Sequence, residues 1–217
     1  DAVRRGANVI FTTTPKLLLS SVRQAALHPD VKILNCSLNT SYPSVRTYYP
    51  RLYGAKFIKG AIAGTLTRDG CIGYVADYPT YGSIASINAF AQGARMVNAN
   101  ARIYLDWAHL RDGGAVGRLQ AQGIVYIDYL DRLAASTGTQ MGNRHNLALI
   151  QTHWGRLYQS LVRRVMEGSW KQEDQGSSAV NYWWGMEQGV VSVLCSRRLP
   201  TGPRRLAGVL REALKAD

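Results

Sequence analysis

Hydrophobic positions in the first part of the chain alternate between short β-rich runs and longer stretches with helical spacing. Residues 8–11 and 31–36 favour strands, and residues 16–27 between them favour a helix. A strand, a helix and a second strand in this order form a β–α–β unit, whose two strands run parallel. The pattern therefore predicts a parallel sheet near the start of the chain.

The same alternation continues through the middle of the chain. Strand-like runs at residues 71–76, 101–107 and 124–129 are separated by helical spacing at residues 84–97 and 114–122. Repetition of strand and helix over this length predicts a doubly wound α/β fold. We expect these three strands to be parallel, with helices on both faces of their sheet.

Two segments break the alternation. Residues 40–50 contain two prolines and polar residues, which predicts a crossover, and residues 134–146 are rich in Ser, Thr, Gly and Asn, which predicts an irregular loop. The remaining predicted elements are a strand over residues 146–152, a helix that ends at Gly168, an apolar run over residues 190–195 and a basic helix over residues 203–215.

The charge of the chain changes this picture little. Its 26 basic and 14 acidic side chains give a formal net charge of +12, which is typical of many nucleic-acid-binding proteins. The basic residues are scattered, in doublets such as Arg163-Arg164, and no recognition helix, zinc-ligand spacing or aromatic RNA-binding motif accompanies them. We therefore predict a solvated basic surface and no nucleic-acid partner; anionic lipid or an acidic partner is the alternative.

The three cysteines, Cys36, Cys71 and Cys195, are far apart in the sequence and odd in number. This pattern predicts no disulfide framework and no metal site, and free thiols favour a reducing compartment. The chain opens at Asp1 without a start methionine, a leader or an apolar run of about 18 residues that could cross a membrane. We expect it to be a fragment or a processed product.

Five segments carry a resemblance to a known family. Residues 53–64 resemble the Y-x-A-x-x-x-x-G-x-x-A-G helix of basic membrane proteins, and residues 72–76 and 87–94 are similar to the family's I-G-Y-V-A and I-N-A-F-x-x-G-A segments in order and spacing. Further on, residues 154–158 and 166–170 resemble its W-G-x-x-Y and G-x-W run. The chain thus resembles a divergent branch of the basic membrane protein family.

The resemblance implies a type I periplasmic-binding-protein fold, in which two α/β lobes close over a small solute. Residues 1–45 would be the remaining part of an incomplete lobe one, residues 46–149 lobe two, and residues 150–217 the return and a C-terminal segment shared between lobes. Family members serve ABC transporters, and several bind purine nucleosides. The implied partners are a nucleoside-like or sugar-bearing solute and the membrane subunits of a transporter, without a cofactor, and the implied location is extracytoplasmic with a lipid anchor.

Ligands of open α/β sheets bind beyond the carboxyl ends of the strands, so the residues that follow each predicted strand are the candidate site. A threonine hydroxyl there can contact a polar solute, a tyrosine or tryptophan ring can stack on a planar base, and a carboxylate can accept sugar hydroxyls. The candidate ligand-binding residues are Thr13, Asn39, Asp77, Tyr78, Tyr81, Trp107, Asp128, Asp131 and Trp154.

Each candidate also has a purely structural interpretation. A threonine can cap the following helix, the rings can pack on a lobe surface, and the acids can be solvated turn residues. Trp154 lies at the lobe return, where we prefer a hinge role. The chain departs from nucleoside-binding members at residues 134–146, which are too short for their additional helix and strand, and at neutral Thr152, where they tend to carry lysine.

No motif of catalysis is present in the sequence: no G-x-S-x-G turn, phosphate loop or H-E-x-x-H, and the four histidines are dispersed. We therefore predict a binding protein and not an enzyme. Two alternatives to solute capture remain open: a cytoplasmic ligand-sensing regulator with the same fold, and a scaffold that binds only protein.

Overall fold

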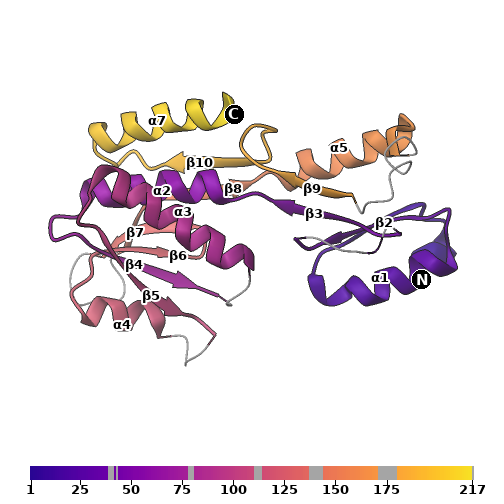
Figure 1. Cartoon of the computed structure of the whole chain (residues 1–217), viewed down its shortest axis with the longest axis horizontal. Coiled ribbons are helices and arrows are strands. Elements are labelled where there is room, and N and C mark those ends of the chain that lie inside the picture. Colours follow the sequence, from indigo (N-terminus) through magenta and orange to yellow (C-terminus); the bar gives the residue numbers. More distant parts are fainter. Residues whose placement is uncertain are drawn as a thin grey trace. The chain divides into compact units, whose positions relative to one another are not determined.

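The computed structural model describes residues 1–38, 42, 44–77, 81–109, 114–136, 144–170 and 180–216, with the side chains of residues 81, 136, 144 and 216 left out. The chain forms two compact units (Figure 1). Unit 1 comprises Asp1–Arg51 and His153–Trp184, and unit 2 comprises Leu52–Thr152 and Gly185–Asp217. The chain therefore passes between the units three times.

Unit 1 is built on a parallel sheet of four strands in the order β1-β2-β3-β9. Helix α1 packs against Ile33 of β2, and Ile10 of β1 packs against the same cluster. Helix α5 packs through Tyr158 against Phe11, the next residue of β1. Because successive residues of a strand point to opposite faces, the two helices cover opposite faces of the sheet. Its elements are β1 (Val9–Thr12), η2 (Pro15–Leu17), α1 (Leu18–Leu27), β2 (Lys32–Cys36), β3 (Arg46–Pro50), α5 (Trp154–Met166) and β9 (Asn181–Trp184), after a short η1 (Val3–Arg5).

The prediction of a crossover over residues 40–50 is wrong for its second half, where Arg46–Pro50 forms the buried inner strand β3. Thr47, Tyr48 and Tyr49 favour extended backbone, and the proline comes only at the last residue of the strand. Prolines favour turns and crossovers, which is why the pattern predicts no strand here. Residues 39–41 and 43 lie outside the described part of the chain.

Unit 2 is built on a mixed sheet of six strands in the order β10-β8-β7-β6-β4-β5. Strand β4 pairs in parallel with both β5 and β6, and the pairings of β7 with β6 and of β8 with β7 and β10 are antiparallel. The predicted parallel order of the three middle strands is confirmed. The elements are α2 (Tyr53–Leu66), β4 (Cys71–Ala76), α3 (Tyr81–Val97), β5 (Arg102–Trp107), α4 (Ala115–Ala121), β6 (Tyr126–Tyr129), β7 (Arg132–Ser136), β8 (Arg144–Thr152), β10 (Val191–Cys195) and α7 (Thr201–Ala216).

Helices cover both faces of this sheet, as a doubly wound fold requires. Tyr74 of β4 meets Phe90 of α3 edge-to-face at 5.1 Å, on the face that also carries α2. The next residue, Val75, packs with Val116 and Leu119 of α4 on the opposite face. The predicted doubly wound α/β class is therefore confirmed. Figure 1 shows α2 and α3 side by side above β4 and β5, and α4 below them.

The prediction of an irregular loop over residues 134–146 is wrong at both ends. Strand β7 extends to Ser136 and strand β8 begins at Arg144, and the two pair in an antiparallel ladder with an irregularity between Leu133 and Ala134. Small and polar residues indicate a loop only where backbone groups stay open to solvent, and here the neighbouring strand pairs with them. Residues 137–143 lie outside the described part of the chain.

Several local predictions are confirmed. Thr14 caps η2, because its side chain accepts a hydrogen bond from the backbone N–H of Lys16. The helix α5 ends before Gly168, whose φ of +77° lies in the left-handed region that suits glycine. The three cysteines are free thiols, and burial raises the pKa of Cys36 and of Cys195.

Among the described residues, no helix is long and apolar enough to span a bilayer.

Close contact between α2 and α3 depends on two glycines. A Cβ at Gly60 would lie 1.9 Å from the carbonyl oxygen of Phe90, and a Cβ at Gly93 would lie 2.0 Å from the carbonyl oxygen of Phe57. Neither carbonyl can move without moving its own helix. The small residues of the family-like segment 53–64 therefore serve helix packing.

Replacing Gly60 with Ala should lower the free energy of unfolding by about 1–3 kcal/mol, because the added methyl group forces the two helices apart. The matched control is Gly208→Ala in α7, where a Cβ meets nothing within 4 Å; that change should be neutral or stabilising by up to about 1 kcal/mol. Urea unfolding of both variants measures the difference. Equal stability of the two would contradict this packing.

Candidate functional site

The carboxyl ends of strands are the places where the chain passes between its units. It leaves unit 1 after β3 at Arg51 and after β9 at Trp184, and it leaves unit 2 after β8 at Thr152. Strand β8 runs in the same direction as β4, β5 and β6, because two antiparallel pairings separate it from β6. All three passages therefore leave a carboxyl edge, where α/β proteins bind ligands.

At the carboxyl edge of unit 2 the structure brings three predicted residues together. Asp77 follows β4 and is exposed, Trp107 is the last residue of β5, and Asp131 follows β6 with its side chain 56% exposed. His109, which the sequence did not single out, joins them: its Nδ1 contacts the carbonyl oxygen of Asp77, and its ring lies 6.2 Å from that of Trp107. An aromatic ring and carboxylates thus share one edge.

Asp128 has a different environment from the other predicted acids. Its side chain is fully buried on the α2 side of β6 and forms ion pairs with two lysines of α2: Lys56 Nζ lies 2.9 Å from Oδ2, and Lys59 Nζ contacts Oδ1. Lys59 is itself 0% exposed. Lys56 and Lys59 lie three residues apart on one helical face, so both reach the same carboxylate. The interpretation of Asp128 as a solvated turn residue is wrong.

Two ammonium groups on one buried carboxylate titrate differently. Burial lowers the pKa of Lys59 to about 8, against the attraction of Asp128. Burial also acts on Lys56, but the attraction of Asp128, supported by Tyr74 and Asp131, outweighs it and holds the pKa of Lys56 above its usual value. Attraction outweighs burial at Lys56 and keeps it charged, whereas burial outweighs attraction at Lys59, which loses its proton first.

Lys56 also fixes the turn that carries Asp131. Its Nζ donates to the carbonyl oxygen of Leu130 at 3.3 Å and lies 3.9 Å from the carboxylate of Asp131. Leu130 has a φ of +50°, the one positive value among the described non-glycine residues. A leucine in this conformation is strained and persists only where neighbouring contacts hold it. The buried ion pair thus sets the position of Asp131 at the carboxyl edge.

At the carboxyl edge of unit 1 a polar cluster surrounds the end of β1. The amide nitrogen of Asn35 donates to the hydroxyl of Thr12 at 2.7 Å and to the carbonyl oxygen of Thr14 at 3.0 Å. Among the described residues, the Asn35 Oδ1 and the Ser37 Oγ are buried and have no hydrogen-bond partner. Thr13 itself is exposed beside this cluster. Sequence reasoning missed Asn35 and Ser37, although both follow the apolar core of β2.

Trp154, the first residue of α5, is 38% exposed and belongs to an aromatic cluster of unit 1. Its ring stacks on Tyr158 with centroids 5.9 Å apart and meets Tyr48 edge-on at 6.4 Å. Tyr48 donates its hydroxyl to the carbonyl oxygen of Thr12 at 3.2 Å, and burial raises its pKa. Packing therefore accounts for one side of Trp154, and its exposed part remains available to a ligand.

The other predicted site residues lie outside the described structure: Asn39 and Tyr78 entirely, and Tyr81 in its side chain. Among the described residues, no group of three or more His, Cys, Asp or Glu side chains could hold a metal ion. The described groups at the two edges are hydroxyls, amides, carboxylates and rings, which suit hydrogen bonding and stacking with a small polar molecule.

Two known proteins are similar to this chain in sequence, and no protein-family model matches it. A purine-binding protein of Brucella abortus is 25% identical over 234 residues, which take in 98% of this chain and 65% of the relative. A putative ABC transporter glucose-binding protein of Haloferax volcanii is 26% identical over 204 residues, 84% of this chain and 50% of the relative. The chain thus spans between half and two thirds of these relatives.

In sequence, this chain is similar to proteins named for binding a purine or glucose. Solved structures agree in fold. An ABC transporter solute-binding protein of Conexibacter woesei superimposes with a TM-score of 0.68 at 14% sequence identity. The match includes 99% of this chain and 79% of that protein. A transcriptional activator of the comK gene from Bacillus halodurans gives a TM-score of 0.74 at 16% identity, covering 99% and 80%. The predicted resemblance and the binding-protein type of α/β fold are confirmed.

The buried ion-pair cluster should dominate the stability of unit 2. Asp128→Asn leaves two lysines without their counterion, which typically costs about 3–5 kcal/mol of unfolding free energy. Asp106→Asn is the matched control, because Asp106 pairs with Arg118 while still 21% exposed, and that loss should cost about 1 kcal/mol or less. Denaturant unfolding of both variants measures the two costs. Similar values would mean that the burial of Asp128 carries no special weight.

The lowered pKa of Lys59 makes a second, pH-dependent prediction. Between pH 8 and pH 10.5 the unfolded chain holds a proton on Lys59 that the folded chain has lost, so unfolding free energy rises with pH in this window. Lys59→Met removes the titrating group. The stability of the natural chain relative to this variant should therefore increase from pH 8 to pH 10, measured by urea unfolding at each pH. A constant difference would refute the lowered pKa.

Proposed function

We propose that this chain is the binding component of an ABC-type transport system and that it captures a small solute, a purine nucleoside or a sugar-bearing molecule, outside the cytoplasm. The observation that carries the proposal is the similarity to a purine-binding protein along 98% of the chain. A sugar-binding name on the second relative supports the same class of ligand. Because the chain spans only part of each relative, the solute and the transporter are proposals.

The chemistry of the carboxyl edges supports such a ligand. The ring of Trp107 can stack on a planar base, and the carboxylate of Asp131 can accept two hydroxyls of a sugar. In unit 1 the oxygen of Asn35 and the hydroxyl of Ser37 are buried polar atoms with no protein partner among the described residues. Buried polar atoms are normally satisfied, so a bound solute is a suitable partner for them.

The remaining predicted residues take supporting roles in this proposal. Thr13 and Asn39 would add polar contacts at the edge of unit 1, Tyr78 and Tyr81 would add rings at the edge of unit 2, and Trp154 would line the site beside the passage at residue 153. Asp77 would act through its position beside His109. Asp128 would position Asp131 through Lys56 and would not touch the solute.

Binding without catalysis is the proposed activity, and no cofactor is part of it. The fold by itself does not assign transport, because a transcriptional activator from Bacillus halodurans has a similar fold. The sequence relatives favour capture for transport over a regulator or a protein scaffold, because one is named a purine-binding protein and the other a putative ABC transporter glucose-binding protein.

Calorimetry with purine bases, nucleosides and hexoses tests the proposal. One of these should bind, and Asp131→Ala should weaken its binding roughly tenfold to a hundredfold, because the solute hydroxyls lose a charged acceptor. Removal of a ring hydroxyl by Tyr81→Phe should have a smaller effect, because the stacking surface is retained.

The matched control is Asp30→Ala. Asp30 is equally an exposed aspartate, but it precedes β2 and so lies at the amino end of its sheet. Its replacement should leave affinity unchanged. If no purine or sugar binds, or if the two aspartate variants bind equally well, the assignment of the carboxyl edge as the solute site is wrong.

A further inference from the structure

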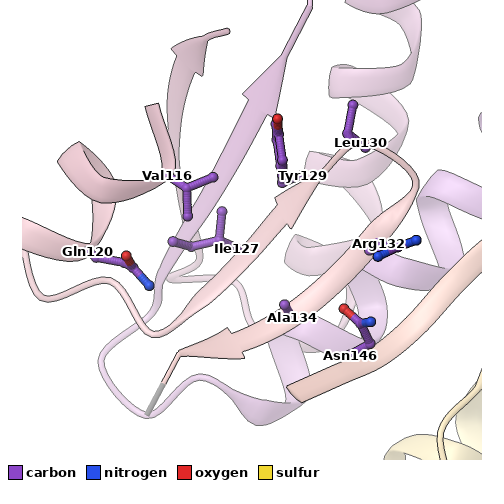
Figure 2. A pocket seen from close by; sticks show the side chains of 8 residues that line it. All are labelled: Val116, Gln120, Ile127, Tyr129, Leu130, Arg132, Ala134 and Asn146. Carbon is purple, nitrogen blue, oxygen red and sulfur yellow. The ribbon is translucent and has the colours of Figure 1, made fainter. Parts of the chain in front are cut away.

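Unit 2 has a cavity on the α4 face of its sheet, and none of the predicted site residues lines it. The cavity has a volume of about 300 Å³ and lies between α4 and the strands β6, β7 and β8 (Figure 2). Val116 and Ile127 lie next to each other in its wall, and Ala134 continues the apolar wall on β7. Ligand pockets begin at about this size, roughly 300 Å³.

The cavity exists because the two faces of the sheet are covered unequally. On one face α2 spans the sheet from β6 to β10. On the other, the seven-residue α4 packs mainly on β4, β5 and β6. Arg132, Leu149 and Leu194 share this second face through their strand register, and Leu194 remains 47% exposed. The small side chain of Ala134 leaves the space beside α4 open.

The polar groups of the cavity suit an anion. Arg132 is exposed at its mouth and, within the described residues, has no ion pair, while Asn146 and Gln120 add amide groups. No carboxylate lines the cavity among those residues. A guanidinium group binds a carboxylate with two parallel N–H···O bonds, and the amides can donate to the same oxygens.

We propose that this cavity is a second ligand site, which binds a small monocarboxylate with an apolar body. The apolar body lies on Ile127, Val116 and Ala134, and the carboxylate accepts hydrogen bonds from Arg132 and Asn146. None of the candidate solute-binding residues lines this cavity, so the proposal stands whether or not the proposed solute function is correct.

Leu130 connects the cavity to the strained turn. Its side chain lines the cavity, while its backbone holds a φ of +50° that leucine rarely adopts. A glycine would relieve this strain. Residue 130 is nevertheless a leucine, although its backbone suits glycine. A ligand that packs against the leucine side chain would explain this.

The test is calorimetric titration of the 217-residue chain with 2-naphthoate, in the absence of any purine or sugar. Naphthoate should bind, and the neutral isostere 2-naphthamide should bind at least about fivefold more weakly, because an exposed ion pair contributes about 1 kcal/mol. Arg132→Gln should reduce naphthoate affinity by the same factor. The matched control is Arg102→Gln, an equally exposed strand arginine of unit 2 outside the cavity, which should bind naphthoate normally.

Leu130→Gly separates binding from folding. It should keep or raise the unfolding temperature, because the turn is relieved, and should weaken naphthoate binding, because the wall is lost. The proposal is overturned if naphthoate does not bind, if naphthamide binds as tightly, or if Arg132→Gln and Arg102→Gln behave alike.

Discussion

A single buried carboxylate joins helix α2 to strand β6 and to the turn that follows it. Asp128 is fully buried and lies between two lysines of α2, one of which also reaches the β6–β7 turn. Charges in such a place are unfavourable alone and are retained only when they are paired. The pairing fixes how α2 lies on β6, and through the carbonyl oxygen of Leu130 it fixes the turn that carries Asp131. The position of the exposed candidate carboxylate therefore depends on a buried one.

The same turn separates two surfaces with different chemistry. Above it, Asp77, Trp107, His109 and Asp131 form a carboxyl edge with rings and acids, suited to a planar or sugar-bearing solute. Next to the turn, Arg132 lies at the mouth of a cavity that suits an anion, because no described carboxylate lines it. One strained residue, Leu130, belongs to both the turn and the cavity wall. Strain of this kind is typical of functional segments, where neighbouring contacts hold the backbone in place.

Much of the fold was predictable from the sequence, because strongly periodic segments specify their own structure. The apolar runs at β4, β5 and β6 predict these parallel strands. The family-like segment 53–64 predicts a helix whose glycines allow close packing. β3 was missed for two reasons. Its proline and polar flanks suggest a crossover, and its burial depends on pairing with β2 and with β9, which is distant in sequence. The pairing of Asp128 with Lys56 and Lys59 was also beyond prediction: 72 residues separate the hydrogen-bonded Lys56 and Asp128, and only the folded sheet brings them together. Asn35 was missed for the same reason, because its hydrogen-bond partners Thr12 and Thr14 are 23 and 21 residues away in the sequence.

The most direct test of solute capture is mass spectrometry of small molecules released when the protein, purified without added ligand, is denatured. We expect one purine, nucleoside or sugar to be released in near-stoichiometric amount from the natural protein and in reduced amount from Asp131→Ala. Release of no small molecule, together with failure of all three ligand classes to bind, would contradict a solute-binding function. It would favour a scaffold that binds only protein.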